Sequence, residues 1–110
     1  MENSVRTEGP FTIVALSGEV DLYYSPKARE LILGCLNKNY YVLVDLSGVS
    51  YIDSSGVASL VEGYQLARSR QLEFGLVGVS HAAMQVLQLA RLDKVFPIYG
   101  TVQEAVEHTK

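Results

Sequence analysis

The chain has 110 residues, of which 48% are apolar, and it carries a formal net charge of −3. This composition argues against disorder and predicts a single folded domain over residues 1–110. Without a basic cluster, neither nucleic acid nor an anionic membrane surface is an expected partner. No apolar run reaches the length of a membrane span and the polar start resembles no signal peptide, so we expect a cytoplasmic protein with no direct membrane insertion. Because Cys35 is the one cysteine, an internal disulfide is excluded. We expect Cys35 to pack as a small buried hydrophobic residue and not to act as a reactive thiol.

Apolar periodicity predicts nine elements along the chain. In chain order they are a weakly indicated strand at 5–7, a strand at 11–16, a helix from 25 to about 37, a strand at 40–46, a helix from 54 to about 70, a strand at 74–77, a helix after 80 to about 90, a strand at 95–98 and a helix at 102–108. After the first two strands, strands and helices alternate. This order predicts an α/β fold: a mainly parallel mixed sheet of about five strands with helices packed against it, and one of the first two strands antiparallel at an edge.

Turn and capping residues set the expected boundaries of these elements. Residues 18–21 are expected to turn the chain, and Asp45 is expected to end its strand as a turn residue. Ser25 is predicted as an N-cap with Pro26 at the first helical position. Ser80 and Thr101 are the expected caps of the last two helices.

The most informative motif is Asp53-Ser54-Ser55-Gly56, which opens the second helix. Asp53 or Ser54 can cap this helix, and Gly56 allows a tight entry. Capping needs only one side chain, and neither serine is followed three residues later by Glu or Gln, so the reciprocal capping box is absent. We therefore expect one serine hydroxyl to be spare and exposed at a helix N-terminus, where backbone N–H groups and the helix dipole favour an added anion.

Enzymatic chemistry has weaker support in the sequence. Residues 78–82 are one residue away from a nucleophile elbow, and a hydrolase built on Ser80 would need a histidine base. His81 is adjacent in sequence and His108 is near the C-terminus, so neither is a convincing base. No metal-ligand spacing and no glycine-rich phosphate loop is present, so we expect no metal, no cofactor and no enzyme activity.

Tyr23 and Tyr24 follow Asp21 directly and form an aromatic pair. Tyrosines in a small domain are expected to be half-buried with the hydroxyl in water. Alternatively, this pair is part of a partner-binding patch, because tyrosine is enriched at protein interfaces.

Three blocks of the sequence resemble the STAS domain, a family named for sulphate transporters and anti-sigma factor antagonists. The blocks lie at 16–21, which ends in Gly-Glu-Val-Asp, at 42–57, and at 87–96. In the middle block an apolar strand, Asp-Leu-Ser and Asp-Ser-Ser-Gly follow one another, and this is the most specific part of the match. The resemblance runs from about residue 11 to residue 108, nearly the whole chain.

The resemblance implies a domain without catalytic activity of its own. In stand-alone bacterial members, an anti-sigma factor that is also an ATP-dependent serine kinase phosphorylates a serine of the Asp-Ser-Ser-Gly turn, and an opposing phosphatase reverses this. The unphosphorylated form binds the kinase and a sigma factor is released. By this resemblance Ser54 is the phosphate acceptor and Ser55 fills a position that varies between Ser and Thr. Asp21 matches an acidic residue beside the acceptor, and Asp53 and Gly56 shape the turn.

The leading hypothesis is thus an anti-sigma factor antagonist that acts by partner switching. A phosphoryl group on Ser54 adds roughly −1.5 to −2 charges beside Asp21 and Asp53. The helix N-terminus should tolerate it, whereas in an interface like charges cost several kcal/mol. The alternative is a STAS subunit of a phospholipid-transport ABC complex, which docks on a transporter component and need not be phosphorylated. Ala58 stands where many family members have Gly, which favours the helix by up to about 1 kcal/mol and alters how a partner approaches its first turn.

Overall fold

The computed structural model describes residues 1–109, and their five strands form one sheet in the order β1-β2-β3-β4-β5. The elements in chain order are β1 (Glu2–Glu8), β2 (Phe11–Val20), α1 (Ser25–Asn37), β3 (Tyr41–Ile52), α2 (Ser54–Ser69), β4 (Phe74–Val77), α3 (His81–Leu89), β5 (Ile98–Tyr99) and α4 (Val102–Thr109). β1 pairs antiparallel with β2 at one edge, and the other three pairs are parallel. The predicted fold class and the antiparallel edge strand are both confirmed.

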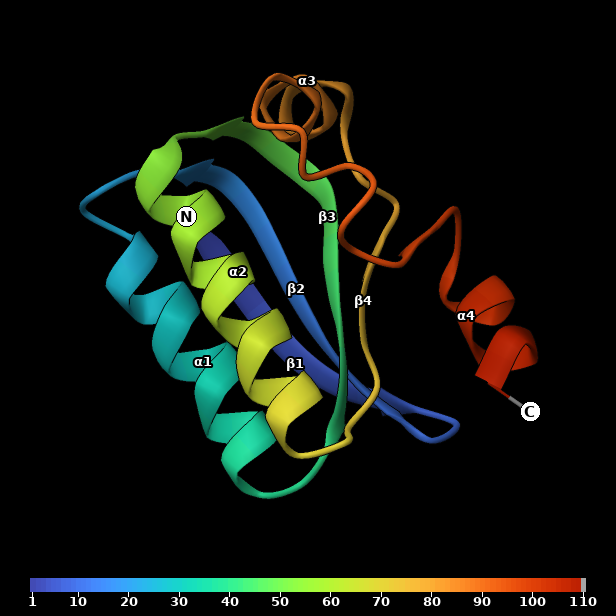
Figure 1. The fold of residues 1–110 in the computed structure, drawn as a ribbon. Helices are drawn as coiled ribbons and strands as arrows, with labels where there is room; N and C mark the ends of the chain where they lie inside the picture. The colour runs from blue at the N-terminus through green and yellow to red at the C-terminus, as the bar shows by residue number, and fades with distance from the viewer. Residues whose placement is uncertain (110) are drawn as a thin grey trace.

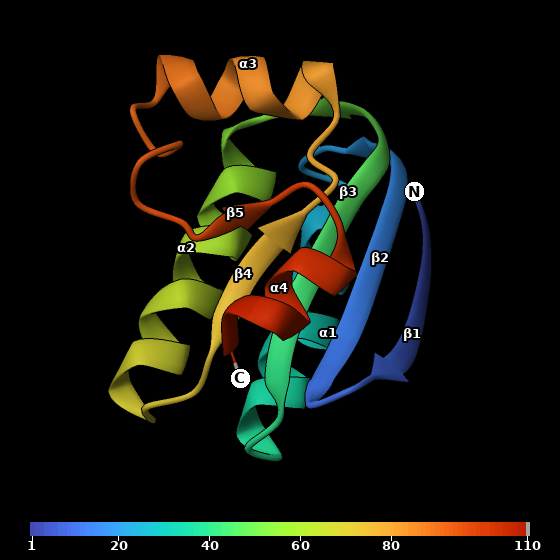
Figure 2. The same cartoon turned by 90° about the vertical axis from the view of Figure 1, so that its right-hand side faces the viewer.

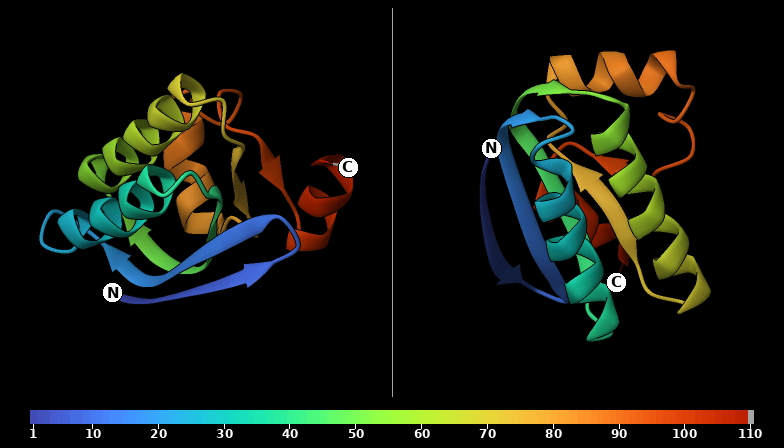
Figure 3. Two further views of the ribbon diagram at one scale, coloured as in Figure 1. Left: turned by 90° about the horizontal axis from the view of Figure 1, so that it is seen from below. Right: turned by 90° about the vertical axis from the view of Figure 1, so that its left-hand side faces the viewer.

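The helices cover the two faces of the sheet unequally. α1 and α2 lie side by side on one face and α4 lies on the other (Figures 1 and 3). α3 crosses the end of the sheet toward which the parallel strands run (Figure 2). Within residues 1–109, no helix has the length and apolar content that a membrane crossing would need.

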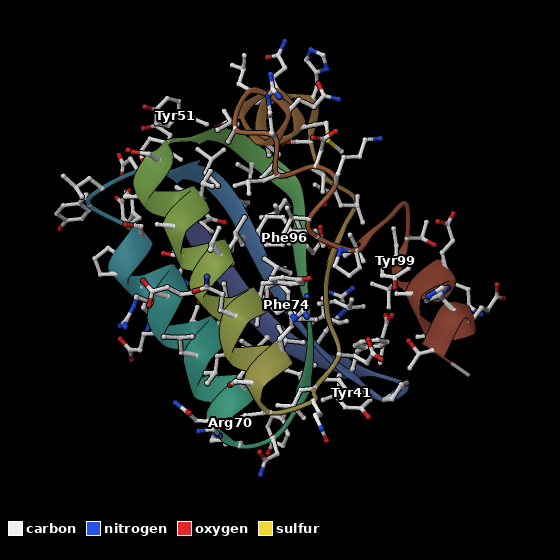
Figure 4. All side chains as sticks on the ribbon, viewed as in Figure 1. Tyr41, Tyr51, Arg70, Phe74, Phe96 and Tyr99 are labelled. Carbon is white, nitrogen blue, oxygen red and sulfur yellow. The ribbon has the colours of Figure 1, made fainter. Side chains whose placement is uncertain are left out.

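Two apolar cores hold these layers together. The larger lies beneath α1, α2 and α3, and the smaller lies beneath α4, where Ala105 meets Phe11, Ile13, Leu43 and Val77. Figure 4 shows Phe74 and Phe96 between α2 and the sheet, and their ring centroids are 6.4 Å apart. Cys35 is half-buried against the larger core, and this burial raises the pKa of its thiol above the ordinary value of 9.0. The environment matches the predicted small hydrophobic residue.

Two parallel strands run further than the apolar pattern predicts. β2 continues through residues 18–20, which are therefore not a turn, and β3 continues to Ile52, so that Asp45 lies within the strand and does not end it. The two strands remain paired up to Val20 and Ile52, with two irregularities in their register. Only residues 42–45 of β3 pair with β4, so the rest of β3 tolerates polar side chains that interrupt the apolar run.

The start of α1 differs from the prediction. Ser25 is a buried residue inside the helix, and the N-cap is Tyr24, which makes no side-chain cap bond. Asp21 organises this turn instead, because its Oδ1 accepts hydrogen bonds from the N–H groups of Tyr23 and Tyr24, both at 3.1 Å. The hydroxyl cap that the Ser-Pro pattern suggested is therefore not formed, and the carboxylate fixes the loop that precedes the helix.

The other predicted boundaries agree better with the structure. Ser80 Oγ caps α3 by accepting a hydrogen bond from the N–H of Ala83 at 3.2 Å, and Thr101 Oγ1 caps α4 through the N–H of Glu104 at 3.2 Å. β5 lies at residues 98–99 and not 95–98. The preceding residues form a turn because the ring of buried Phe96 packs on α2, with its centroid 5.6 Å from that of Tyr64.

Candidate functional site

The Asp-Ser-Ser-Gly turn lies at the carboxyl edge of the parallel strands, the edge at which α/β sheets place their functional groups. Val20 and Ile52, the last residues of β2 and β3, are register partners. Asp21 and Asp53 follow these two residues directly, and the N–H of Asp53 donates to the carbonyl of Val20 at 3.3 Å. The two acidic residues therefore lie close together at one rim of the sheet.

Asp53 is the side chain that organises the site. Its Oδ1 accepts hydrogen bonds from the N–H groups of Ser55 (3.0 Å) and Gly56 (3.3 Å) and from Ser55 Oγ (2.5 Å), which makes it the N-cap of α2. Its Oδ2 accepts from the N–H of Leu22 at 3.1 Å. These bonds lower the pKa of Asp53 below the ordinary 3.8, the Ser55 hydroxyl contributing most.

Ser54 is the serine whose hydroxyl is not used by the fold. It is the first residue of α2, its side chain is exposed, and its hydroxyl makes no hydrogen bond with any residue in the range 1–109. Ser55 differs because its half-buried hydroxyl donates to Asp53. The expectation of one spare, exposed hydroxyl at this helix N-terminus is met, and the residue is Ser54.

Most backbone N–H groups at the start of α2 already donate hydrogen bonds within the domain, so they contribute less to binding an added anion than expected from the sequence. The side chain of Asp53 accepts hydrogen bonds from the N–H groups of Ser55 and Gly56. Its backbone carbonyl accepts one from the N–H of Val57 at 3.0 Å. Of the first four N–H groups of the helix, only that of Ser54 has no acceptor among residues 1–109. An anion added here would share the helix end with the Asp53 carboxylate.

Position 56 requires glycine because the backbone of α2 lies too close to β2 and β3 to leave room for a side chain. A Cβ at this position would lie 2.7 Å from Ile52 Cγ1 and 2.8 Å from the carbonyl oxygen of Val20. These atoms belong to the ends of β3 and β2, so the first turn of α2 rests directly on the sheet. The predicted tight entry into the helix is confirmed.

Asp21 lies at the same edge of the sheet, but its carboxylate bonds to the loop that directly follows it. Its Oδ1 accepts the N–H groups of the following loop, and no hydrogen bond joins it to Ser54 within residues 1–109. Its contribution to the site is to fix the loop beside the Ser54 turn and to add negative charge there.

Ser59 is a structural residue of the site that the sequence analysis did not single out. It is only 4% exposed, and its hydroxyl lies 3.4 Å from the carbonyl of Ser25 in α1 and 3.2 Å from that of Ser55. This hydroxyl ties the first turns of α1 and α2 together. The available signal was a hydroxyl residue at the i+4 position from Ser55, on the face of the helix that packs against α1.

The alternative hydrolase site is not assembled in this structure. The Ser80 hydroxyl accepts the cap bond of α3, His81 is exposed, and the ring of His108 lies against Tyr99 with centroids 5.7 Å apart. None of the hydrogen bonds formed by residues 1–109 joins Ser80 to a histidine. Over the same range, no group of three His, Cys, Asp or Glu side chains is arranged to hold a metal ion.

Comparison with known proteins identifies the family. The STAS domain family model matches residues 3–105. The anti-sigma-B factor antagonist of Listeria monocytogenes is 33% identical over 86 residues, which cover 77% of this chain and 75% of that protein. The similar solved structures include a candidate anti-sigma factor antagonist from Thermotoga maritima (TM-score 0.89, 26% identity, 96% of this chain and 92% of that one). Another is an anti-sigma-factor antagonist (STAS) domain protein from Planctomyces limnophilus (TM-score 0.85, 28% identity, 96% of each chain). The chain therefore belongs to the STAS domain family.

Proposed function

We propose that this protein is an anti-sigma factor antagonist that works by partner switching. Its unphosphorylated form binds an anti-sigma factor that is also a serine kinase, and phosphorylation of Ser54 ends this binding. An opposing phosphatase removes the phosphoryl group and restores the binding form. The chain itself is a binding module and catalyses no reaction.

The observation that carries the proposal is the state of the Ser54 hydroxyl. It is exposed, it takes no part in the hydrogen bonds of the fold, and it stands at the first position of α2 on the carboxyl edge of the sheet. A kinase can therefore approach Ser54 Oγ without breaking any interaction of the domain. In the transfer, the γ-phosphoryl group of ATP forms a bond to Ser54 Oγ, its bond to ADP breaks, and the hydroxyl proton is lost.

The charge of the modified site supports a switch of affinity. A phosphoserine adds roughly −1.5 to −2 charges and three acceptor oxygens. It would stand next to Asp53 and near Asp21, at an edge where most of the backbone N–H groups are already bonded. In open solvent this crowding costs little, but in a contact from which water is excluded it costs several kcal/mol. The domain would remain folded while its complex dissociates.

The relatives support the class of partner. The Listeria monocytogenes protein is an antagonist of an anti-sigma-B factor by name, and it covers most of this chain. By analogy, the partner of this chain is an anti-sigma factor. The proposal also requires a cytoplasmic location, because ATP and sigma factors are found there.

The direct test is phosphorylation by the purified anti-sigma factor kinases of the same bacterium with ATP, followed by intact-mass and peptide mass spectrometry. The wild type and Ser55→Ala should each gain one phosphoryl group, carried in the wild type by Ser54, and Ser54→Ala should gain none. Ser55→Ala is the matched control, since it removes the neighbouring hydroxyl. Modification of Ser54→Ala at the wild-type rate would contradict the proposal.

The alternative, a subunit of a phospholipid-transport ABC complex, requires different properties of the same surface. A docking subunit needs neither a free Ser54 hydroxyl nor a kinase. It would co-purify with an ATPase and a membrane permease, and Ser54→Ala would bind that complex as well as the wild type does. The free Ser54 hydroxyl and the names of the relatives favour the antagonist.

A further inference from the structure

Three large apolar side chains stand in solvent on the loop between β2 and α1. Leu22 is 75% exposed, Tyr23 is 81% exposed and Tyr24 is 37% exposed. The rings of Tyr23 and Tyr24 meet edge to face, with centroids 4.8 Å apart and an interplanar angle of 82°. Half-burial was expected for most of the tyrosines, with a partner-binding patch as the alternative for this pair, and Tyr23 is largely exposed. Residues 22–24, here called the aromatic loop, thus expose apolar area that the fold does not use.

The backbone of the aromatic loop is nevertheless fixed in place. The N–H of Leu22 donates to Asp53 Oδ2, and the N–H groups of Tyr23 and Tyr24 donate to Asp21 Oδ1, all at 3.1 Å. A loop held in this way presents its side chains to a partner with little further loss of conformational entropy. Exposed aromatic residues on a fixed backbone are typical of residues that dominate binding energy at interfaces.

The aromatic loop is adjacent to Ser54. Leu22 is hydrogen-bonded to Asp53, the residue that directly precedes Ser54, and both segments lie at the same end of the molecule, beside the start of α2 (Figure 1). Tyr51, which is 49% exposed, lies at this end as well (Figure 4). A specific protein interface covers about 800 Å² on each partner, which corresponds to a patch of roughly 16 Å radius. A kinase that brings ATP to Ser54 Oγ with an interface of this size covers the aromatic loop.

We infer that the aromatic loop is the docking surface for the serine kinase that phosphorylates Ser54, and that Leu22 and Tyr23 are its apolar anchors. The inference rests on the proposed function and adds to it where the kinase holds the domain. Docking and phosphoryl transfer are then served by different residues. The anchors set the affinity for the kinase, whereas the hydroxyl of Ser54 accepts the phosphoryl group.

Steady-state kinetics with the purified anti-sigma factor kinase that phosphorylates Ser54 separates the two roles. The variants are Leu22→Ser, Tyr23→Ser, and Tyr23→Phe, which keeps the ring. The matched control is Tyr40→Ser (47% exposed), which removes an exposed aromatic side chain next to the start of β3, at the opposite end of this strand from the Ser54 turn. All three positions are exposed, so urea unfolding should show the same stability for each variant within the usual range of surface substitutions.

We expect Leu22→Ser and Tyr23→Ser each to raise KM for the domain by about tenfold or more, with kcat changed less than about twofold. Tyr23→Phe and Tyr40→Ser should stay within about twofold of the wild-type KM. If KM is unchanged in the loop variants while Ser54 is phosphorylated, the docking inference is wrong and the proposed function stands. A fall in kcat at constant KM would also overturn it, since the loop would then position Ser54 and not bind the kinase. If no kinase phosphorylates Ser54 of the wild type, the proposed function fails and the inference fails with it.

Discussion

The carboxylate of Asp53 bonds to the backbone of Leu22, a residue 31 positions earlier in the chain, with 3.1 Å between Oδ2 and the nitrogen. The other oxygen of the same carboxylate caps α2. One side chain therefore fixes both the helix that presents Ser54 and the loop that presents Tyr23. The stability and the binding surface of this edge depend on the same group.

Asp53→Ala and Ser54→Ala should differ clearly in stability although the two residues are neighbours. Removing an N-cap carboxylate costs about 1 kcal/mol, within a range of about 0.5–2 kcal/mol, and here the bond to Leu22 is lost as well. Removing the Ser54 hydroxyl should change the free energy of unfolding by less than about 0.5 kcal/mol. Urea denaturation measures both values, and equal losses would mean that Ser54 shares the cap.

The stability contributed by Asp53 should depend on pH in a defined direction. Its pKa is lowered from 3.8 in the folded protein, so its contribution is complete above the unfolded value and is lost as the pH falls through the folded one. The advantage of the wild type over Asp53→Asn should be constant above about pH 5 and shrink toward pH 2.5. Asp93→Asn controls for net charge, because Asp93 makes no side-chain hydrogen bond within residues 1–109. Stability curves that stay parallel for the wild type and Asp53→Asn would refute this assignment.

Gly56→Ala should destabilise the fold while Gly34→Ala does not. The added methyl at Gly56 would meet Ile52 and Val20 at 2.7–3.0 Å, whereas nothing lies within 4 Å of a methyl at Gly34. We expect a loss of about 1–3 kcal/mol for Gly56→Ala. At Gly34, inside α1, alanine should gain up to about 1 kcal/mol from helix propensity. Thermal unfolding of the two variants gives the comparison, and a neutral Gly56→Ala would show that the start of α2 can move away from the sheet.

Ser54→Asp should leave the domain folded and nearly as stable as the wild type. At the first position of a helix a carboxylate gains about 0.3–1 kcal/mol from the dipole, and repulsion from Asp53 offsets a similar amount. The variant should nevertheless lose its affinity for the anti-sigma factor kinase. Circular dichroism melting and titration calorimetry test the two parts, with Ser54→Asn as an uncharged control of similar size. A melting temperature lowered by more than about 8 °C would show that the charge acts on the fold.

The sequence predicted those parts of the structure that depend on local periodicity and local capping. The order of the elements, the helix beginning at Ser54 and the caps at Ser80 and Thr101 follow from residues within one or two turns of each other. The candidate turn was also identified, and the structure distinguishes its two serines by the bond from Ser55 to Asp53.

Features that depend on pairing between distant segments were missed. Exposed serine and glycine residues interrupt the apolar pattern in the second half of β3, and this part is a strand because β2 pairs with it. A local feature was missed as well: α1 has no side-chain cap, since Ser25 lies inside the helix and the carboxylate of Asp21 bonds to the loop that precedes it. The bond from Leu22 to Asp53 joins the ends of two strands whose register no local pattern determines.

The central claim is that the phosphorylation state of Ser54 controls binding. Its most direct test is titration calorimetry of the anti-sigma factor kinase with two forms of the same protein, one unphosphorylated and one fully phosphorylated on Ser54. The account predicts that the phosphorylated form binds more weakly by a factor of about 100 or greater, which corresponds to a loss of about 3 kcal/mol or more of binding free energy. Equal affinities of the two forms would contradict it.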